Sequence, residues 1–136
     1  MAITFTKYDS YKNDLLQGNI DLDSDTLKVA LVTSDYTFSA AHNFFDDITG
    51  ELSATGGYTA GGATIASPTI SSGAFDAADT SWSSATFTTA GGVVYKSTGT
   101  AGTSPLIGFI NFDGNQSPAD QTFKIVWNAA GIITIA

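Results

Sequence analysis

The densest group of acidic side chains alternates along five residues. Asp21, Asp23 and Asp25 form an Asp-x-Asp-x-Asp pattern, which resembles the opening of a calcium-binding loop, where alternating oxygens point at one ion. The rest of such a loop is missing, because Thr26 stands where glycine allows the sharp turn and Val32 where a bidentate glutamate belongs. The pattern therefore favours a solvated acidic turn, with a weak calcium site as the alternative.

The side chains that could act as general acid or base are few. The chain has one histidine, His42, and one glutamate, Glu51, and it has no cysteine and no arginine. No metal-binding histidine motif surrounds His42, and no Gly-x-Ser-x-Gly elbow marks a nucleophile, although a Ser-His-Asp site assembled across the fold stays open. We therefore predict a protein that is not an enzyme and holds no cofactor or metal, with a surface or packing role for His42.

A glycine-rich stretch at 56–62, with the sequence GGYTAGG, invites comparison with phosphate-binding loops. No Gly-Lys-Ser/Thr follows and no lysine is near, and a dinucleotide fingerprint would need a strand and a helix on its two sides. We predict a flexible or bulged loop in which Tyr58 is an anchoring aromatic.

Aromatic residues could instead form a platform for a sugar ring, since the chain has two tryptophans and five tyrosines. Trp127 follows Phe123 and Ile125 at a spacing of two, which predicts a core position on one face of a strand. Trp82 begins a strand and fits either role. A glycan-binding β-sandwich used for adhesion therefore stays open as an alternative.

Length and composition limit the remaining classes. The chain has 136 residues, with 13 acidic against 5 basic side chains and a net charge of -8. This balance argues against direct binding to nucleic acid or to an anionic membrane, because such partners are held mainly through Lys and Arg. We expect one domain over residues 1–136. The N-terminus lacks the features of a signal peptide, so we expect synthesis in a cytoplasm.

The elements that position these residues change type along the chain. Alternation at 3–6 predicts a strand, and 9–18 predicts a short helix that ends at Gly18. In the strand predicted at 26–32, Leu27, Val29 and Leu31 share one face, opposite Lys28 and Ala30. Helical spacing of apolar residues predicts a second helix between Ser39 and Thr49.

From residue 56 onward the sequence predicts only strands. Turn residues recur about every 10 positions, for example at Ser72-Gly73 and at 98–104, which is typical of an antiparallel sandwich or small barrel. We therefore predict a mainly β fold, an antiparallel β-sandwich or small jelly-roll-like barrel, with one or two short helices in the N-terminal half. Gly131 is expected to turn the last two strands into a hairpin. The strands are predicted at 63–70, 82–88, 93–98, 106–112, 121–128 and 132–135.

One predicted strand is apolar on both faces. In 106–112, Ile107 and Phe109 alternate with Leu106, Ile110 and Phe112. Such a strand is either covered on both sides within the chain or meets another subunit. The terminal residues 132–135 pose the same question, because an exposed apolar edge would aggregate unless something covered it.

Four segments resemble a family of small virion proteins of tailed bacteriophages. The segments are TLKVALVTS at 26–34, GYTAGG at 57–62, SPLIGFINF at 104–112 and FKIVWNAAGII at 123–133. The resemblance covers most of the chain in the same order. It implies a structural protein of the virion, most readily a head decoration (cement) protein on the capsid surface, and it implies no catalytic residues.

A decoration protein of this kind would bind the assembled head as a homo-oligomer, with the major capsid protein as its partner. A trimer at a three-fold axis is the preferred assembly, because avidity multiplies weak contacts. A tail, baseplate or fibre-attachment module is the alternative within the virion. Of the 13 acidic residues, 9 lie in the first 51 positions, so we expect the nearly uncharged half to face the capsid. The apolar side chains predicted to make subunit or capsid contacts are Ile3, Phe5, Tyr8, Ile107, Phe109, Ile133 and Ile135.

Overall fold

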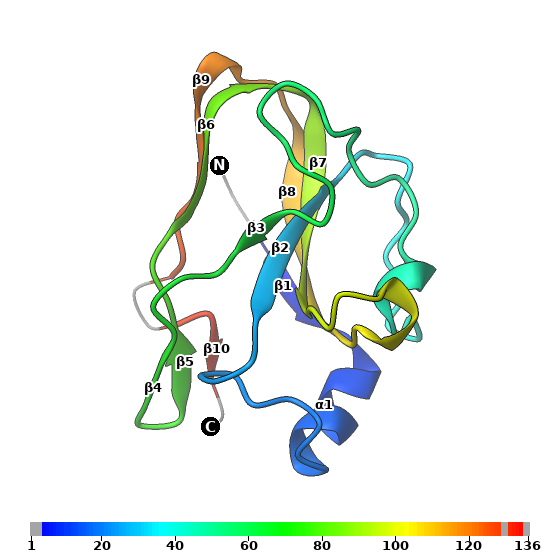
Figure 1. Cartoon of the computed structure of the whole chain (residues 1–136), viewed down its shortest axis with the longest axis vertical. Helices are drawn as coiled ribbons and strands as arrows, with labels where there is room; N and C mark the ends of the chain where they lie inside the picture. Colours follow the sequence, from blue (N-terminus) through cyan, green and yellow to red (C-terminus); the bar gives the residue numbers. More distant parts are fainter. Residues whose placement is uncertain (1–3, 129–130, 135–136) are drawn as a thin grey trace.

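The computed structural model describes residues 4–128 and 131–134 as two layers of antiparallel strands and one α-helix (Figure 1). The strands are β1 Thr4–Lys7, β2 Leu27–Val32, β3 Ala63–Thr64, β4 Thr69–Ser71, β5 Ala74–Asp76, β6 Thr80–Thr86, β7 Thr89–Lys96, β8 Leu106–Gln116, β9 Ala119–Ile125 and β10 Ile133–Thr134. One layer is a five-stranded sheet in the order β1-β8-β7-β2-β3. The other combines the pair β6-β9 with the sheet β10-β5-β4. The predicted mainly β, antiparallel, sandwich-like fold is confirmed.

The two layers enclose the main core, as the alternation in β2 and β9 predicts. Leu27, Val29 and Leu31 of β2 face this core together with Phe123 and Ile125 of β9. Since both strands alternate with a period of two, the other face of β9 carries the exposed Thr122 and Lys124, whereas the other face of β2 carries the buried Ala30 and Val32. The main core consists of Tyr11, Ile20, Leu22, Leu27, Val29, Leu31, Leu52, Tyr58, Ile65, Phe75, Trp82, Ala85, Val94, Ile107, Ile110, Phe112, Phe123, Ile125, Trp127 and Ile133.

A second cluster covers the opposite face of the five-stranded sheet. Its buried members are Tyr8, Ala30, Val32, Tyr36, Val93, Tyr95 and Leu106, and the half-buried Phe38, Phe45, Ile48 and Phe109 pack against them. Most of the covering side chains come from the irregular segment 33–50, which lies on the far side of the sheet from β6 and β9 (Figure 1).

Strand β8 is apolar on both faces because both faces are covered within the chain. Leu106 packs in the second cluster and Ile107 in the main core, and both are fully buried. The pairing register with β7 shifts between Val94 and Tyr95, so the simple alternation expected for the strand is broken by a bulge. Internal coverage, one of the two alternatives left by the sequence, is what the structure shows.

Helix α1, Asp9–Leu16, is confirmed, whereas the second predicted helix is wrong. Between Ser39 and Thr49 the chain forms only a single 3-10 turn, η1, at Phe45–Asp47. The carboxylate of Asp47 accepts hydrogen bonds from the backbone N–H groups of Asn43 and Phe44. These bonds hold a short turn, and the aromatic residues pack onto the sheet, so tertiary contacts override the helical spacing.

Two strand predictions also change. Residues 63–70 are not one strand, because Ser67 has a positive φ of 55° and Pro68 follows it. Here β3 ends and β4 begins, and β4 forms a hairpin with the unpredicted β5 around the expected Ser72-Gly73 turn. Gly131 does have a positive φ, but β10 pairs with β5 rather than with β9. The predicted C-terminal hairpin is therefore wrong.

Candidate functional site

The predicted contact residues mostly serve the interior of this chain. Tyr8, Ile107 and Ile133 are buried, so their side chains are not available to a partner in this structure. Phe5 and Phe109 are half-buried, and the Phe5 ring lies over Gly108 on the neighbouring strand β8. The other two, Ile3 and Ile135, lie outside the described residues.

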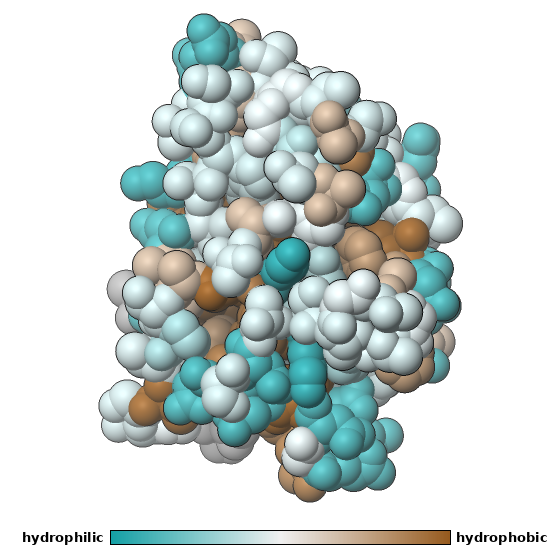
Figure 2. Space-filling model, viewed as in Figure 1, coloured by the Kyte–Doolittle hydropathy of each residue, from teal (hydrophilic) through white to brown (hydrophobic). Residues whose placement is uncertain are grey.

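Exposed apolar side chains occur instead at the end of the molecule formed by α1 and the β4–β5 hairpin. Leu16 is 85% exposed and Ile70 is 52% exposed. Beside them is an apolar groove of about 130 Å³, lined by Tyr11, Leu15, Leu22, Ile70, Gly73, Ala74, Phe75 and Ile133. Hydrophobic atoms are visible here between the hairpin and α1, bordered by hydrophilic residues (Figure 2). We call this surface the apolar end.

The three aspartates of the acidic turn do not converge on one point. Asp25 pairs with Lys96 at 3.1 Å and also accepts a hydrogen bond from the backbone N–H of Asp21. Asp21 and Asp23 share a hydrogen bond, which lowers the pKa of Asp21 and raises the pKa of Asp23. Among the described residues, no group of three or more His, Cys, Asp or Glu side chains is placed to hold a metal ion. The geometry favours the solvated turn.

His42 ends a chain of hydrogen-bonded rings. Its Nδ1 lies 2.8 Å from the Tyr36 hydroxyl, which in turn lies 2.9 Å from the Tyr8 hydroxyl. Tyr8 is fully buried, and burial raises the pKa of both phenols above their ordinary value. These bonds tie segment 33–50 to the start of α1, so the contacts of His42 are those of a packing residue.

Glu51 holds the glycine-rich loop against the sheet. Its Oε2 accepts hydrogen bonds from the Tyr58 hydroxyl and the Gly61 N–H, both at 2.6 Å. The Tyr58 oxygen also accepts a bond from the backbone of Leu31 in β2. Tyr58 is 3% exposed, which confirms its prediction as an anchor. The loop runs so close to β2 that a Cβ on Gly62 would overlap the carbonyl of Val29.

The aromatic platform considered from the sequence is absent from the surface. Trp127 is 8% exposed, which confirms its prediction as a core residue, and Trp82 is 6% exposed and also lies in the main core. All five tyrosines are buried as well. A glycan-binding role therefore cannot use a tryptophan or tyrosine face in this structure.

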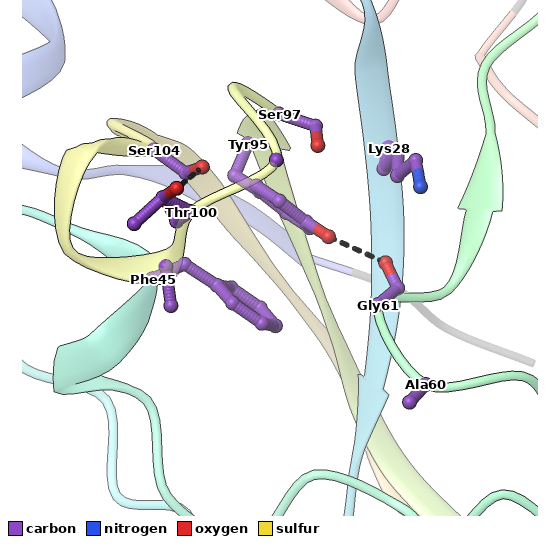
Figure 3. A pocket seen from close by; sticks show the side chains of 10 residues that line it. Lys28, Phe45, Ala60, Gly61, Tyr95, Ser97, Thr100 and Ser104 are labelled. Atoms are coloured by element: carbon purple, nitrogen blue, oxygen red, sulfur yellow. Dashed lines mark hydrogen bonds between the residues drawn. The ribbon is translucent and has the colours of Figure 1, made fainter.

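A polar groove of about 250 Å³ opens where two loops meet over strands β2 and β7. Lys28 and Gly61 lie on one side, Thr100 and Ser104 on the other, and Tyr95 and Phe45 between them (Figure 3). Ala60, Ser97, Gly99 and Ala101 complete the lining. This groove is the second candidate site, after the apolar end.

The walls of the polar groove are held in place by their own contacts. The Tyr95 hydroxyl donates to the Gly61 carbonyl at 2.6 Å, and the Ser104 hydroxyl donates to the Thr100 carbonyl at 2.8 Å. The rings of Phe45 and Tyr95 stack with centroids 4.2 Å apart. Burial, assisted by the charge of Glu51, raises the pKa of Tyr95 to about 12. The hydroxyl therefore stays a donor at neutral pH.

Comparison with known proteins adds no relative. No protein-family model, no curated protein and no solved structure matches this chain. Within the described residues, no helix is long and apolar enough to cross a membrane. Any assignment of function therefore depends on the residues themselves and on the segments quoted above.

Sequence reasoning missed the polar groove. The alternation in β2 correctly predicts that Lys28 lies on the face away from the main core, but the sequence indicates 98–104 only as a turn between strands. The abundance of Ser and Thr in that segment was the available signal, because hydroxyl-rich loops over a sheet can line a polar site. No local sequence pattern indicates that the loop at 97–104 lies next to residues 60–61.

Proposed function

We propose that this protein is a structural protein of a bacteriophage virion, a decoration protein that binds the assembled head as an oligomer and stabilises it. The major capsid protein is the proposed partner, a trimer is the preferred assembly, and the capsid surface is the proposed location. The resemblance of the four segments to small phage virion proteins supports the proposal that this chain is a virion protein. The structure supports a role in binding rather than in catalysis.

The proposal rests on one observation: the side chains suited to catalysis are engaged within the chain, whereas apolar side chains are exposed. The best acid-base candidates, His42 and Glu51, are taken up by contacts within the chain. In contrast, Ile70 lines the apolar groove and is 52% exposed, and Leu16 follows the groove residue Leu15 on α1 and is 85% exposed. Exposed apolar patches rimmed by polar residues mark interaction surfaces. The apolar end is therefore the proposed contact with the shell. Since it combines α1 of the acidic half with the β4–β5 hairpin, this proposal replaces the expectation that the nearly uncharged half alone faces the capsid.

Stabilisation of the head follows from mass action. A protein that binds the assembled shell better than it binds loose subunits shifts the equilibrium toward the shell by an amount that grows with its free concentration. Such a protein needs a well-packed fold and an exposed apolar surface, and this chain has both. It needs no active site.

The test adds purified protein to capsids that lack it. We expect the protein to sediment with the capsids and to raise their melting temperature. Leu16→Glu combined with Ile70→Glu should abolish both effects, because each change places a charge on the proposed contact. Val126→Glu is the matched control, since Val126 is 59% exposed but lies beyond the end of β9 and does not line the apolar groove. Failure of the unmodified protein to bind or to stabilise capsids would contradict the proposal.

Electron cryomicroscopy of the virion separates the two locations. A decoration protein is present in many copies over the shell, whereas a tail, baseplate or fibre-attachment module is present in few. Density for this fold confined to the tail would replace the head assignment by the alternative.

A further inference from the structure

We propose that the polar groove binds a carboxylate carried on a hydroxylated ring, that is, one acidic monosaccharide unit. The proposal is independent of a phage role, because it concerns only the groove between loops 59–61 and 97–104. It also differs from the tryptophan or tyrosine platform considered from the sequence, because those rings are buried. Three features of the groove support it: an unpaired ammonium, unpaired hydroxyls and a preformed aromatic floor.

The ammonium of Lys28 lacks a negative partner. Lys96 pairs with Asp25 and Lys12 with Asp9, but Lys28 has neither an ion pair nor a side-chain hydrogen bond within the described part of the chain. It is half-buried, and the groove lining includes no carboxylate, although the chain has 13 acidic residues. An ammonium without a carboxylate partner is available to form a charge-assisted hydrogen bond with an anion that enters the groove. The groove therefore favours an anionic ligand.

A single cation favours a carboxylate over a phosphate. The chain has no arginine, and Lys28 is the one lysine in the lining of this groove. A carboxylate carries one charge, which one ammonium neutralises in a charge-assisted hydrogen bond. A phosphate carries close to two charges at neutral pH and would leave one unmatched in an acidic protein.

The rest of the lining suits a sugar ring. The hydroxyls of Ser97 and Thr100 make no hydrogen bond to any other described residue, so both can bond a hydroxylated ligand. Phe45 extends into the groove beside Tyr95 (Figure 3), and the C–H face of a pyranose packs on such a ring. The volume of about 250 Å³ accommodates one monosaccharide and not an extended oligosaccharide.

The groove is preorganised for this ligand. Hydrogen bonds join Tyr95 to Gly61 and Ser104 to Thr100. The carboxylate of Glu51 also accepts a hydrogen bond from the Gly61 N–H. Binding then orders few additional groups, which lowers its entropic cost. With one ammonium and two hydroxyls as ligand contacts, we expect an affinity in the millimolar range.

The test is a titration of the isolated, isotopically labelled protein followed by nuclear magnetic resonance. Sodium D-glucuronate is the probe, D-glucose is its neutral counterpart, and sodium acetate is a carboxylate without a ring. We expect glucuronate to shift the amide signals of Lys28, Ser97, Gly99 and Thr100. Glucose and acetate should each bind about tenfold more weakly, because each lacks one half of the recognised group.

Variants then locate the site. Lys28→Gln should weaken glucuronate binding about tenfold, and Ser97→Ala should weaken it less. Lys124→Gln is the matched control, since Lys124 is exposed on β9. Each variant's spectrum also shows whether it is folded, and the comparison of glucuronate with glucose on the unmodified protein needs no variant.

Three results would overturn the proposal. The first is the absence of shifts at the groove residues with glucuronate. The second is equal binding of Lys28→Gln and the unmodified protein. The third is acetate binding as tightly as glucuronate, which would make the groove a simple anion site. None of these results bears on capsid binding, so the two proposals fail separately.

Discussion

The two faces of the five-stranded sheet are covered in different ways. Against one face lie strands β6, β9 and β5, whose apolar side chains interdigitate with those of β2 and β8. Against the other lies the irregular segment 33–50, held by side-chain hydrogen bonds and aromatic contacts. Phe112 meets Phe123 edge-on in the main core, whereas Phe38 and Phe109 stack in the second cluster.

The difference shows how a segment without regular secondary structure can cover one face of a sheet. Strands satisfy their own backbone groups by pairing, so their packing needs only apolar side chains. Segment 33–50 has few backbone hydrogen bonds to the sheet, such as the one from the Leu106 N–H of β8 to the Asn43 carbonyl. It compensates with the hydrogen-bonded Tyr8–Tyr36–His42 chain. We therefore expect the main core to set global stability and the second cluster to open locally.

Removing a ring from each face is the strongest test of this contrast. Phe112→Ala should destabilise the fold by about 3–5 kcal/mol, because Phe112 is fully buried and a cavity would remain. Phe38→Ala should cost about 1–2 kcal/mol, since the ring is only half-buried. Urea denaturation measures both changes. Equal losses in the free energy of unfolding would show that the two faces unfold as one unit.

Alkaline titration tests the burial of the tyrosines on both faces of the sheet. Burial raises the pKa of all five phenols, that of Tyr95 to about 12. The unfolded chain loses these protons from about pH 10, so this stability is fully present below that pH and is lost as the pH rises through the folded values.

The ultraviolet absorbance of phenolate, recorded together with circular dichroism, measures this loss. We expect little phenolate in the folded protein and a rise in its absorbance together with the loss of the circular dichroism signal, because burial keeps all five phenols protonated. Normal titration of most phenols near pH 10 in a folded protein would contradict the burial described here.

A pair of Tyr→Phe variants isolates the hydrogen bonds of the second cluster. Tyr36→Phe should cost about 1–3 kcal/mol, because it leaves the buried Tyr8 hydroxyl and His42 Nδ1 without their partner. Tyr11→Phe is the control in the main core, where the hydroxyl has no hydrogen-bond partner. It should be neutral or slightly stabilising. The opposite order of the two thermal midpoints would refute this role for the ring chain.

Hydrogen exchange measures the smallest expected effect and resolves it at individual backbone amides. Amides of 33–50 should exchange through local openings, faster than those of β7 and β8. Tyr36→Phe should speed exchange in 33–50 and leave the central strands unchanged. Equal protection of segment 33–50 and of β7 would indicate a single cooperative unit.

Much of the fold follows from local pattern. Alternation placed Leu27, Val29 and Leu31 on one face, and it placed Trp127 in the core. The helix ending near Gly18 and the turn at Ser72-Gly73 follow from residue type, because glycine adopts a positive φ without steric cost. These predictions succeed since side-chain periodicity reports directly which face is buried.

Pairing and cover between distant segments could not be predicted in this way. Whether β10 pairs with β9 or β5 depends on where the β4–β5 hairpin lies, and β5 itself is too short to stand out in the sequence. The helical spacing of 39–49 was outweighed by aromatic packing onto the sheet. Both outcomes depend on contacts between residues far apart in the chain, which local preference does not encode.

The same division applies to the candidate sites. Residue types by themselves determined that the chain has few groups for catalysis, one anchoring tyrosine in a glycine-rich loop and a strand with two apolar faces. Only the tertiary structure decided that those faces are covered internally, that Leu16 and Ile70 remain exposed, and that Lys28 lines a groove with Ser97 and Thr100. Composition limits which chemistry is available, but a site exists only where folding brings separate segments within contact distance.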